Sequence, residues 1–168
     1  IYDEGDLPYT DNGRAAFARY SSFIASSVAP EVMLFEVWNE WNIGMGSKPR
    51  RKYGSPEDYV KLTAEAARAV KQAKPNSIVI GGSLADDLGD WPWLRQAISF
   101  GLLNHVDGIS VHMYNYYNSP NNGGDAEFMK RLHQLEQILQ KTKPKSPPKI
   151  YITEIGWPNH SGKGSVTP

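Results

Sequence analysis

Apolar residues along this chain recur at two spacings, that of amphipathic helices and that of buried strands. Helical spacing begins at four places, each with a residue suited to a helix N-terminus: Thr10 or Asp11, Ser55, Asp90 and Asp125. A short apolar segment follows each predicted helix, and we expect strands over residues 32–38, 77–83, 106–114 and 150–154. Helix and strand alternate without a break, which predicts one α/β unit with a parallel sheet.

The second predicted helix has the clearest boundaries. Ser55 can cap its N-terminus, Pro56 suits its first position, and the acidic residues Glu57 and Asp58 complement the helix dipole. Pro75 marks its end. The third helix is expected to run from its cap, Asp90, through about residue 103.

The predicted strands differ in polarity between their two faces, because side chains alternate along a strand. In the third strand, polar Ser110, His112 and Tyr114 oppose apolar Ile109, Val111 and Met113. In the first, Glu36, Trp38 and Glu40 share one face. An open sheet covered by helices on both sides would be apolar on both faces. One apolar and one polar face instead favour a barrel, with helices outside and functional groups inside.

Two glutamates stand at the ends of predicted strands: Glu40 ends the first and Glu154 ends the last. The C-terminal ends of barrel strands are where such folds place their chemistry. A pair of carboxylates at these strand ends is typical of a glycosidase active site. One must be protonated to give its proton to the leaving oxygen, and the other must be ionised to attack the anomeric carbon.

Composition and charge exclude several classes of partner and cofactor. The 168 residues carry a formal net charge of 0, which argues against nucleic acid or a membrane surface as a partner. No apolar segment approaches the roughly 18 residues of a membrane span. The absence of cysteine excludes disulfides and thiolate metal sites. We expect no metal and no nucleotide cofactor, because no glycine-rich phosphate loop follows a strand and the histidines form no close ligand pair in the sequence: His105, His112, His133 and His160.

Four motifs occur in order along the chain: Trp38-Asn39-Glu40, then Gly81-Gly82-Ser83, then Val106-Asp107-Gly108-Ile109-Ser110-Val111-His112-Met113-Tyr114, then Thr153-Glu154-Ile155-Gly156-Trp157-Pro158. The set resembles glycoside hydrolases of clan A, the retaining enzymes on TIM barrels. It is most similar to family 39-type sequences, with families 5 and 17 as relatives. The resemblance covers nearly the whole chain and implies a (β/α)8 TIM-barrel fold. It also implies retaining hydrolysis of a poly- or oligosaccharide by double displacement, without a cofactor. Because family 39-type sites act on xylosides, iduronides and bacterial exopolysaccharides, the substrate is left open.

The resemblance also implies roles for single residues. Glu40 matches the general acid/base and Glu154 the nucleophile. Asn39 matches the residue that binds the sugar 2-hydroxyl. His112 and Tyr114 match positions that orient the substrate or the nucleophile, and Tyr114 is a candidate hydrogen-bond donor to Glu154.

Three tryptophans stand beside the two glutamates: Trp38, Trp41 and Trp157. Sugars present apolar C–H faces to aromatic rings, so we expect at least one of these rings to line the substrate cleft. Packing in the core is the alternative for each.

The resemblance assigns residues 1–168 to about strands four to seven of an eight-stranded barrel. We therefore expect a partial barrel catalytic domain that belongs to a longer protein and needs the missing barrel segments, or a second copy of the chain, as a partner. The alternative function is a non-catalytic carbohydrate-binding or partner-assembled half barrel. Glu36 is predicted to point into the barrel, where a buried carboxylate needs a partner, and we expect a structural ion pair.

Overall fold

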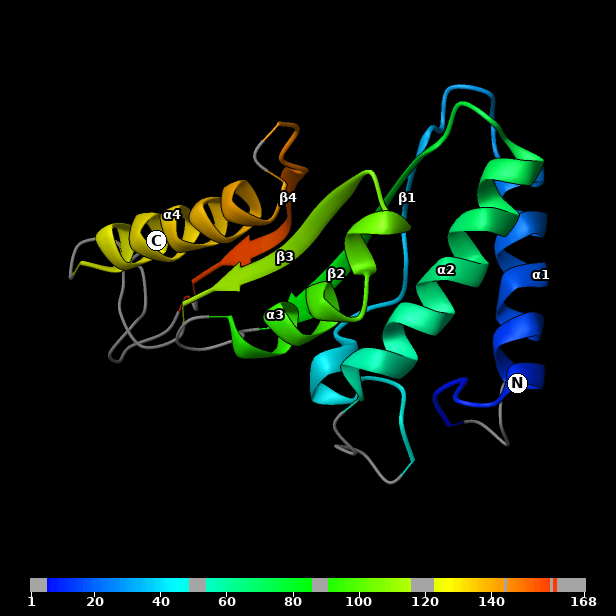
Figure 1. Cartoon of the computed structure of the whole chain (residues 1–168), viewed down its shortest axis with the longest axis horizontal. Coiled ribbons are helices and arrows are strands. Elements are labelled where there is room, and N and C mark those ends of the chain that lie inside the picture. Colours follow the sequence, from blue (N-terminus) through cyan, green and yellow to red (C-terminus); the bar gives the residue numbers. More distant parts are fainter. Residues whose placement is uncertain are drawn as a thin grey trace.

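A computed structural model describes residues 6–48, 54–85, 91–115, 123–143, 145–157 and 159. Its four strands form one parallel sheet in sequential order (Figure 1): β1 Leu34–Glu36, β2 Ile78–Ala85, β3 Gly108–Tyr114 and β4 Lys149–Gly156. Four helices precede them in turn: α1 Asp11–Ser27, α2 Pro56–Ala73, α3 Pro92–Ser99 and α4 Gly124–Thr142. This confirms the predicted alternation and the parallel sheet.

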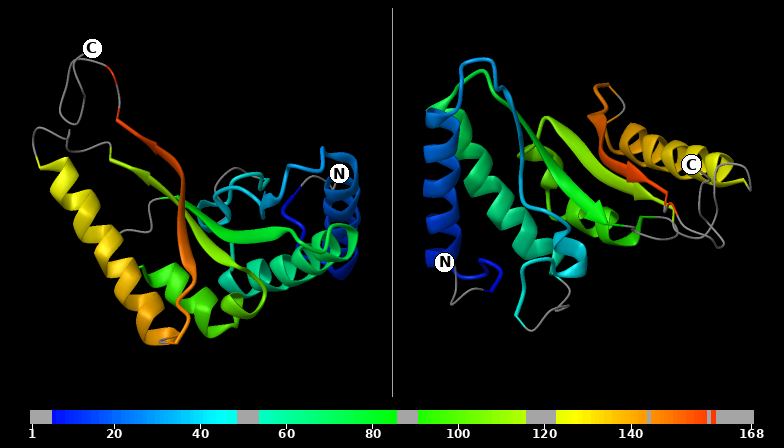
Figure 2. Two further views of the ribbon diagram at one scale, coloured as in Figure 1. Left: turned by 90° about the horizontal axis from the view of Figure 1, so that it is seen from above. Right: turned by 180° about the vertical axis from the view of Figure 1, so that it is seen from behind.

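The sheet is curved, and its helices lie on one side of it. Figure 2 shows α2, α3 and α4 on the same side, while the opposite side of the sheet is open. Helix α1 packs against α2 at one end of the molecule. The arrangement is a curled half barrel with its helices outside, as the polarity of the strands predicts. No helix in the described part of the chain is long and apolar enough to cross a membrane.

The predicted capping residues explain where two helices begin. The Thr10 side chain accepts a hydrogen bond from the Gly13 N–H, and the Ser55 side chain accepts one from the Asp58 N–H. Asp90, the predicted cap of the third helix, lies outside the described residues. That helix is also shorter than predicted: α3 ends at Ser99, and Gly101, with φ of 96°, separates it from a 3-10 turn over Leu102–Asn104.

The core lies between the sheet and its helices. Ile109, Val111 and Met113 of β3 are buried in one cluster with Leu135 and Leu139 of α4. The predicted outer face of the third strand is therefore confirmed. Ser110, His112 and Tyr114 occupy the other face, which carries the functional groups described below.

The first strand ends earlier than its apolar pattern predicts. It stops at Glu36, and two residues later Trp38 has a left-handed backbone with φ of 67°. The alternation of faces is lost there, and the Trp38 ring packs 5.3 Å from the Phe17 ring of α1. The prediction that Trp38 shares a face with Glu36 and Glu40 is therefore wrong.

Glu36 lies on the open side of the sheet but forms no ion pair with any described residue. Its Oε1 accepts a hydrogen bond of 2.9 Å from the Thr153 hydroxyl, which joins β1 to β4 across the arc. The side chain is exposed, so no basic partner is required.

Candidate active site

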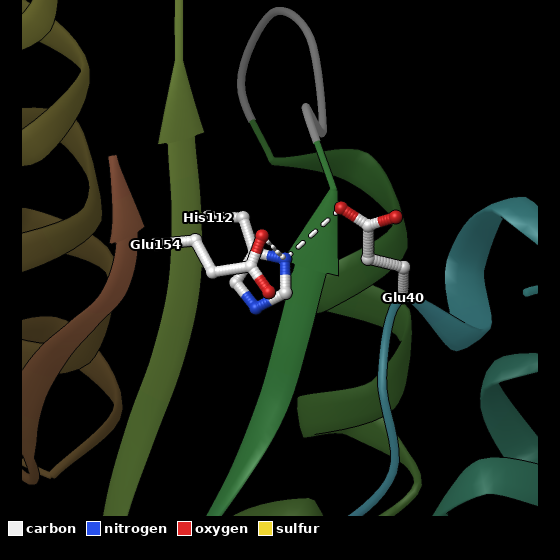
Figure 3. Close-up of side chains that lie close together, drawn as sticks. All are labelled: Glu40, His112 and Glu154. Atoms are coloured by element: carbon white, nitrogen blue, oxygen red, sulfur yellow. Dashed lines mark hydrogen bonds and ion pairs between the residues drawn. The ribbon is translucent and has the colours of Figure 1, made fainter. Parts of the chain in front are cut away.

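Three predicted site residues from three separate segments meet on the open side of the sheet (Figure 3). Glu40 follows β1, His112 lies in β3 and Glu154 lies in β4. The His112 Nδ1 is 3.0 Å from Glu40 Oε1 and 3.5 Å from Glu154 Oε2. One ring nitrogen of His112 and one oxygen of each carboxylate all lie within 4.8 Å of one another.

The two carboxylates differ in their surroundings. The Glu40 side chain is 14% exposed and that of His112 1%, whereas the Glu154 side chain is 41% exposed. Glu154 Oε2 also accepts a hydrogen bond of 3.0 Å from the Tyr114 hydroxyl, the contact expected from the sequence. Within the described residues, neither glutamate forms an ion pair with a lysine or an arginine. The imidazole is the only basic side chain in contact with the pair there.

A bulge in β4 sets the direction of the Glu154 side chain. Val111 pairs with Ile152, but the next residue, His112, pairs with Glu154, so Thr153 is an extra residue in β4. Such a bulge re-aims side chains near a functional site. Thr153 contacts Glu36 and Glu154 approaches His112, so two consecutive residues both face the open side.

Glu40 is held by unusual backbone geometry. Trp38, Glu40 and Ser83 have φ of 67°, 46° and 43°, in the left-handed region that costs about 1–3 kcal/mol per non-glycine residue. The Ser83 carbonyl accepts a 2.9 Å hydrogen bond from the Glu40 N–H, and the Ser83 hydroxyl donates to the Trp38 carbonyl at 3.0 Å. The Ser110 hydroxyl accepts from the Ser83 N–H at 2.9 Å. These bonds join the segment carrying Glu40 to β2 and β3.

Tyr59 of α2 supports the same strand ends from the helical side. Its hydroxyl donates to the Val37 carbonyl at 2.9 Å and accepts from the Gly82 N–H at 2.7 Å. The residue is fully buried, and burial raises the pKa of its hydroxyl to about 12. The apolar spacing of the second predicted helix includes Tyr59 but does not reveal these hydrogen bonds. Only a general rule pointed to this role: the hydroxyl of a buried tyrosine needs a hydrogen-bond partner.

The three candidate tryptophans have different surroundings in the structure. Trp41 is fully buried, its ring contacts Tyr9 and Tyr59, and its Nε1–H donates to the Ser55 carbonyl at 3.0 Å. The expectation that Trp41 binds substrate is therefore wrong, because no ring face is available to a sugar.

The remaining candidates differ in how they lie. Trp38 is half-buried and packs against Phe17 and Trp41, and its place in the cleft stays a prediction. Trp157 is half-buried directly after β4 and stays a candidate for stacking. Asn39 is exposed directly before Glu40 and stays a candidate for binding the sugar.

No family model and no curated protein matches the sequence. Solved structures do match. The chain is similar to a family 39 glycoside hydrolase from Bacteroides cellulosilyticus, with a TM-score of 0.68 and 21% identity over 90% of this chain and 31% of that one. The chain has the fold of part of a TIM barrel, the fold of these glycoside hydrolases.

Two further structures have the same fold. A family 39 enzyme from Xanthomonas axonopodis pv. citri matches with a TM-score of 0.57 and 23% identity, over 94% of this chain and 31% of that one. A glucosidase from Croceicoccus marinus matches with a TM-score of 0.68 and 18% identity, over 89% and 32%. The chain therefore spans about a third of the length of these glycoside hydrolases.

Proposed function

We propose that this chain carries both catalytic glutamates of a retaining glycoside hydrolase that cleaves O-glycosidic bonds in a poly- or oligosaccharide. The observation that carries the proposal is the meeting of Glu40 and Glu154 on the open side of a half barrel. The chain would form part of a catalytic barrel whose other segments come from a longer protein or from a partner.

The separation of the carboxylates favours retention over inversion. One oxygen of each lies within 4.8 Å of the other. Retaining enzymes place their carboxyl groups about 5–5.5 Å apart, whereas inverting enzymes need about 6.5–9.5 Å to admit a water molecule. The space between Glu40 and Glu154 suits direct attack on the sugar.

In the proposed reaction, Glu154 attacks the anomeric carbon while Glu40 gives its proton to the leaving oxygen. The glycosyl–Glu154 ester is then hydrolysed by water, whose proton returns to Glu40. The more exposed carboxylate is thus the nucleophile, and its Oε2 is oriented by the Tyr114 hydroxyl. The enclosed carboxylate, beside His112, is the acid/base.

Three neighbours have supporting roles in this proposal. His112 contacts both carboxylates through Nδ1 and so fixes their relative position. Asn39 would bind the sugar 2-hydroxyl, and Trp157 would stack on a sugar ring.

A non-catalytic carbohydrate-binding or partner-assembled half barrel is the second candidate. The observation that favours it is the openness of the site: the Glu154 side chain is 41% exposed, and the chain spans only 31% of a complete enzyme. Such a protein would bind sugars without cleaving them.

The test compares aryl glycosides with good and poor leaving groups. A Glu154→Gln variant should lose activity on both kinds by at least about 10³-fold, because the attacking group is gone. A Glu40→Gln variant should lose about 10²–10⁴-fold on poor leaving groups but much less on dinitrophenyl glycosides, which need no proton. Glu136→Gln, on the exposed surface of α4, is the matched control.

Product stereochemistry decides the mechanism. NMR of the first-formed sugar should show retained configuration at the anomeric carbon. Inverted product, or turnover unaffected by Glu154→Gln, would contradict the proposal. Sugar binding without turnover, in both the 168-residue chain and a longer form of the protein, would favour the second candidate.

A further inference from the structure

The imidazole and the two carboxylates of the candidate active site also form a set of metal-ligand atoms. His112 Nδ1, Glu40 Oε1 and Glu154 Oε2 converge from three segments of the chain. The sequence spacing of the histidines could not reveal this set, because only one member is a histidine and the others are far away along the chain. We propose that Glu40, His112 and Glu154 bind a divalent transition-metal ion of the Zn²⁺ class.

The distances fit one ion shared by three protein ligands. Zinc lies about 2.0–2.2 Å from histidine nitrogen and carboxylate oxygen, so ligand atoms around a tetrahedral ion are about 3.4 Å apart. The His112 Nδ1 is 3.0 and 3.5 Å from the two carboxylate oxygens. One oxygen of each carboxylate lies within 4.8 Å of one oxygen of the other, and Glu154 must give up its present hydrogen bond to Tyr114 to close the remaining gap.

The charge of the site also favours a cation. Two carboxylates face one imidazole, and among the described residues no lysine or arginine pairs with either of them. A neutral imidazole donates at most one hydrogen bond through Nδ1, which leaves excess negative charge between the glutamates. A divalent ion balances that charge.

The ligand set selects the class of metal. One imidazole nitrogen and two carboxylate oxygens suit Zn²⁺, Co²⁺ or Ni²⁺, whereas Ca²⁺ requires six to eight oxygen ligands. Three protein ligands leave one position for water. Because the ion would occupy the space between Glu40 and Glu154, it would exclude a sugar from that space.

The binding test uses the metal alone. The 168-residue chain, stripped with a chelator and exchanged into metal-free buffer, is titrated with ZnCl₂ in a calorimeter, and with CoCl₂ while visible absorption is recorded. We expect one ion per chain and a Co²⁺ spectrum of low coordination number. His112→Gln and Glu154→Gln should each weaken Zn²⁺ binding by about tenfold or more, because removing a ligand costs at least as much as removing its supporting contacts.

The control replaces a histidine that pairs with a single glutamate on the surface of the protein. His133 of α4 lies 3.4 Å from Glu136 on the exposed surface, so His133→Gln should leave the affinity unchanged. Glu154→Gln tests the proposal even if the buried His112 variant misfolds, which circular dichroism would reveal. No Zn²⁺ binding, or binding that survives Glu154→Gln or falls equally with His133→Gln, would overturn it.

The consequence for catalysis rests on the proposed function and is tested separately. Zn²⁺ should inhibit aryl glycoside hydrolysis competitively, with relief by chelator. Zn²⁺ binding in a chain that hydrolyses no glycoside would support the metal site and count against the glycosidase. Non-competitive inhibition would place the ion away from the catalytic glutamates and would overturn the proposal.

Discussion

Single hydrogen bonds decide how the two glutamates are presented. Glu154 is partly exposed and would rotate freely without the Tyr114 hydroxyl at 3.0 Å and the His112 imidazole at 3.5 Å. Glu40 is more enclosed and contacts the same imidazole at 3.0 Å. His112 is thus the residue through which the two carboxylates are held relative to each other.

Replacement of Tyr114 by phenylalanine should lower kcat with little change in folding stability. A hydrogen bond to a charged acceptor contributes about 1.5–3 kcal/mol, which corresponds to about 10–100-fold in rate if it is needed in the transition state. Steady-state kinetics on aryl glycosides measures the effect. Tyr151→Phe, near the start of β4 and three residues before Glu154, should behave as wild type. Equal kinetics for the two variants would show that the Tyr114 hydroxyl does not orient the nucleophile.

Asp107 should make the fold sensitive to acid. Burial alone would raise the pKa of its carboxyl group, but hydrogen bonds from Lys71 Nζ and the Val79 N–H, with the Lys71 charge, lower it below the ordinary value of 3.8. A folded-state pKa below the unfolded value stabilises the protein above about pH 4, and this contribution is lost as the pH falls through the lowered pKa.

Urea unfolding on both sides of about pH 4 tests this expectation. Asp107→Asn should lose part of the stability at neutral pH, and its unfolding free energy should depend less on pH than that of wild type. The exposed Glu31 provides the control Glu31→Gln. An unchanged pH dependence in the Asp107 variant would mean that another group governs acid sensitivity.

At the level of elements, the ends of β1 and β2 are irregular and held from both sides. The hydroxyl of Tyr59, in α2, forms hydrogen bonds with the backbone of Val37 and Gly82. From the neighbouring strand β3, the Ser110 hydroxyl accepts a hydrogen bond from the Ser83 N–H. Gly82 permits this close approach: its φ is 120°, and a Cβ there would lie 2.5 Å from the Ser110 carbonyl oxygen. The left-handed residues near Glu40 persist because these contacts over-determine them.

Gly82→Ala should therefore destabilise the fold by about 3 kcal/mol or more, from the backbone conformation and the clash together. The matched control is Gly123→Ala, before α4, where φ is 82° but no atom lies within 4 Å of an added Cβ. That variant should lose only the conformational cost of about 1–2 kcal/mol. Denaturant unfolding of both proteins measures the difference, and equal losses would show that the approach to Ser110 is not tight.

At the level of the molecule, the half barrel leaves apolar surface exposed along its edges. Leu34 on β1 is 44% exposed, and Ile152 and Ile155 on β4 are 39% and 50% exposed. A groove of about 790 Å³ runs between α4 and β4, with apolar walls that include Leu132 and Ile150. Unpaired edge strands with such neighbours favour association with other chains.

The isolated 168-residue chain should therefore form dimers or larger species in solution. Light scattering across a concentration series measures the association, and Ile152→Lys, at the edge of β4, should reduce it. Gln96→Lys is the control, because Gln96 is an exposed polar residue on α3 and its replacement removes no apolar surface. A monomer at all concentrations that unfolds cooperatively would show that the arc is self-sufficient.

Local patterns were enough to predict the elements and the main partners in the site. Helical and strand periods are properties of neighbouring residues, so the alternation, the parallel sheet and the two faces of β3 follow from the sequence. Because parallel strands end at the same edge, the approach of Glu40 and Glu154 could also be expected.

Tertiary contacts determine the backbone irregularities and side-chain directions that the spacing of apolar residues does not predict. The alternation of faces assumes a regular strand, and it fails where Trp38 takes a left-handed backbone and where Thr153 forms a bulge. Whether a tryptophan stacks on sugar or fills the core depends on what packs beside it, and Tyr9 and Tyr59 enclose Trp41. The sequence was enough to place Glu154 near the end of the last strand and Glu40 shortly after the first. The packing of strands and helices against one another decided which way those residues point, because irregular backbone is stable only where neighbouring segments supply its hydrogen bonds.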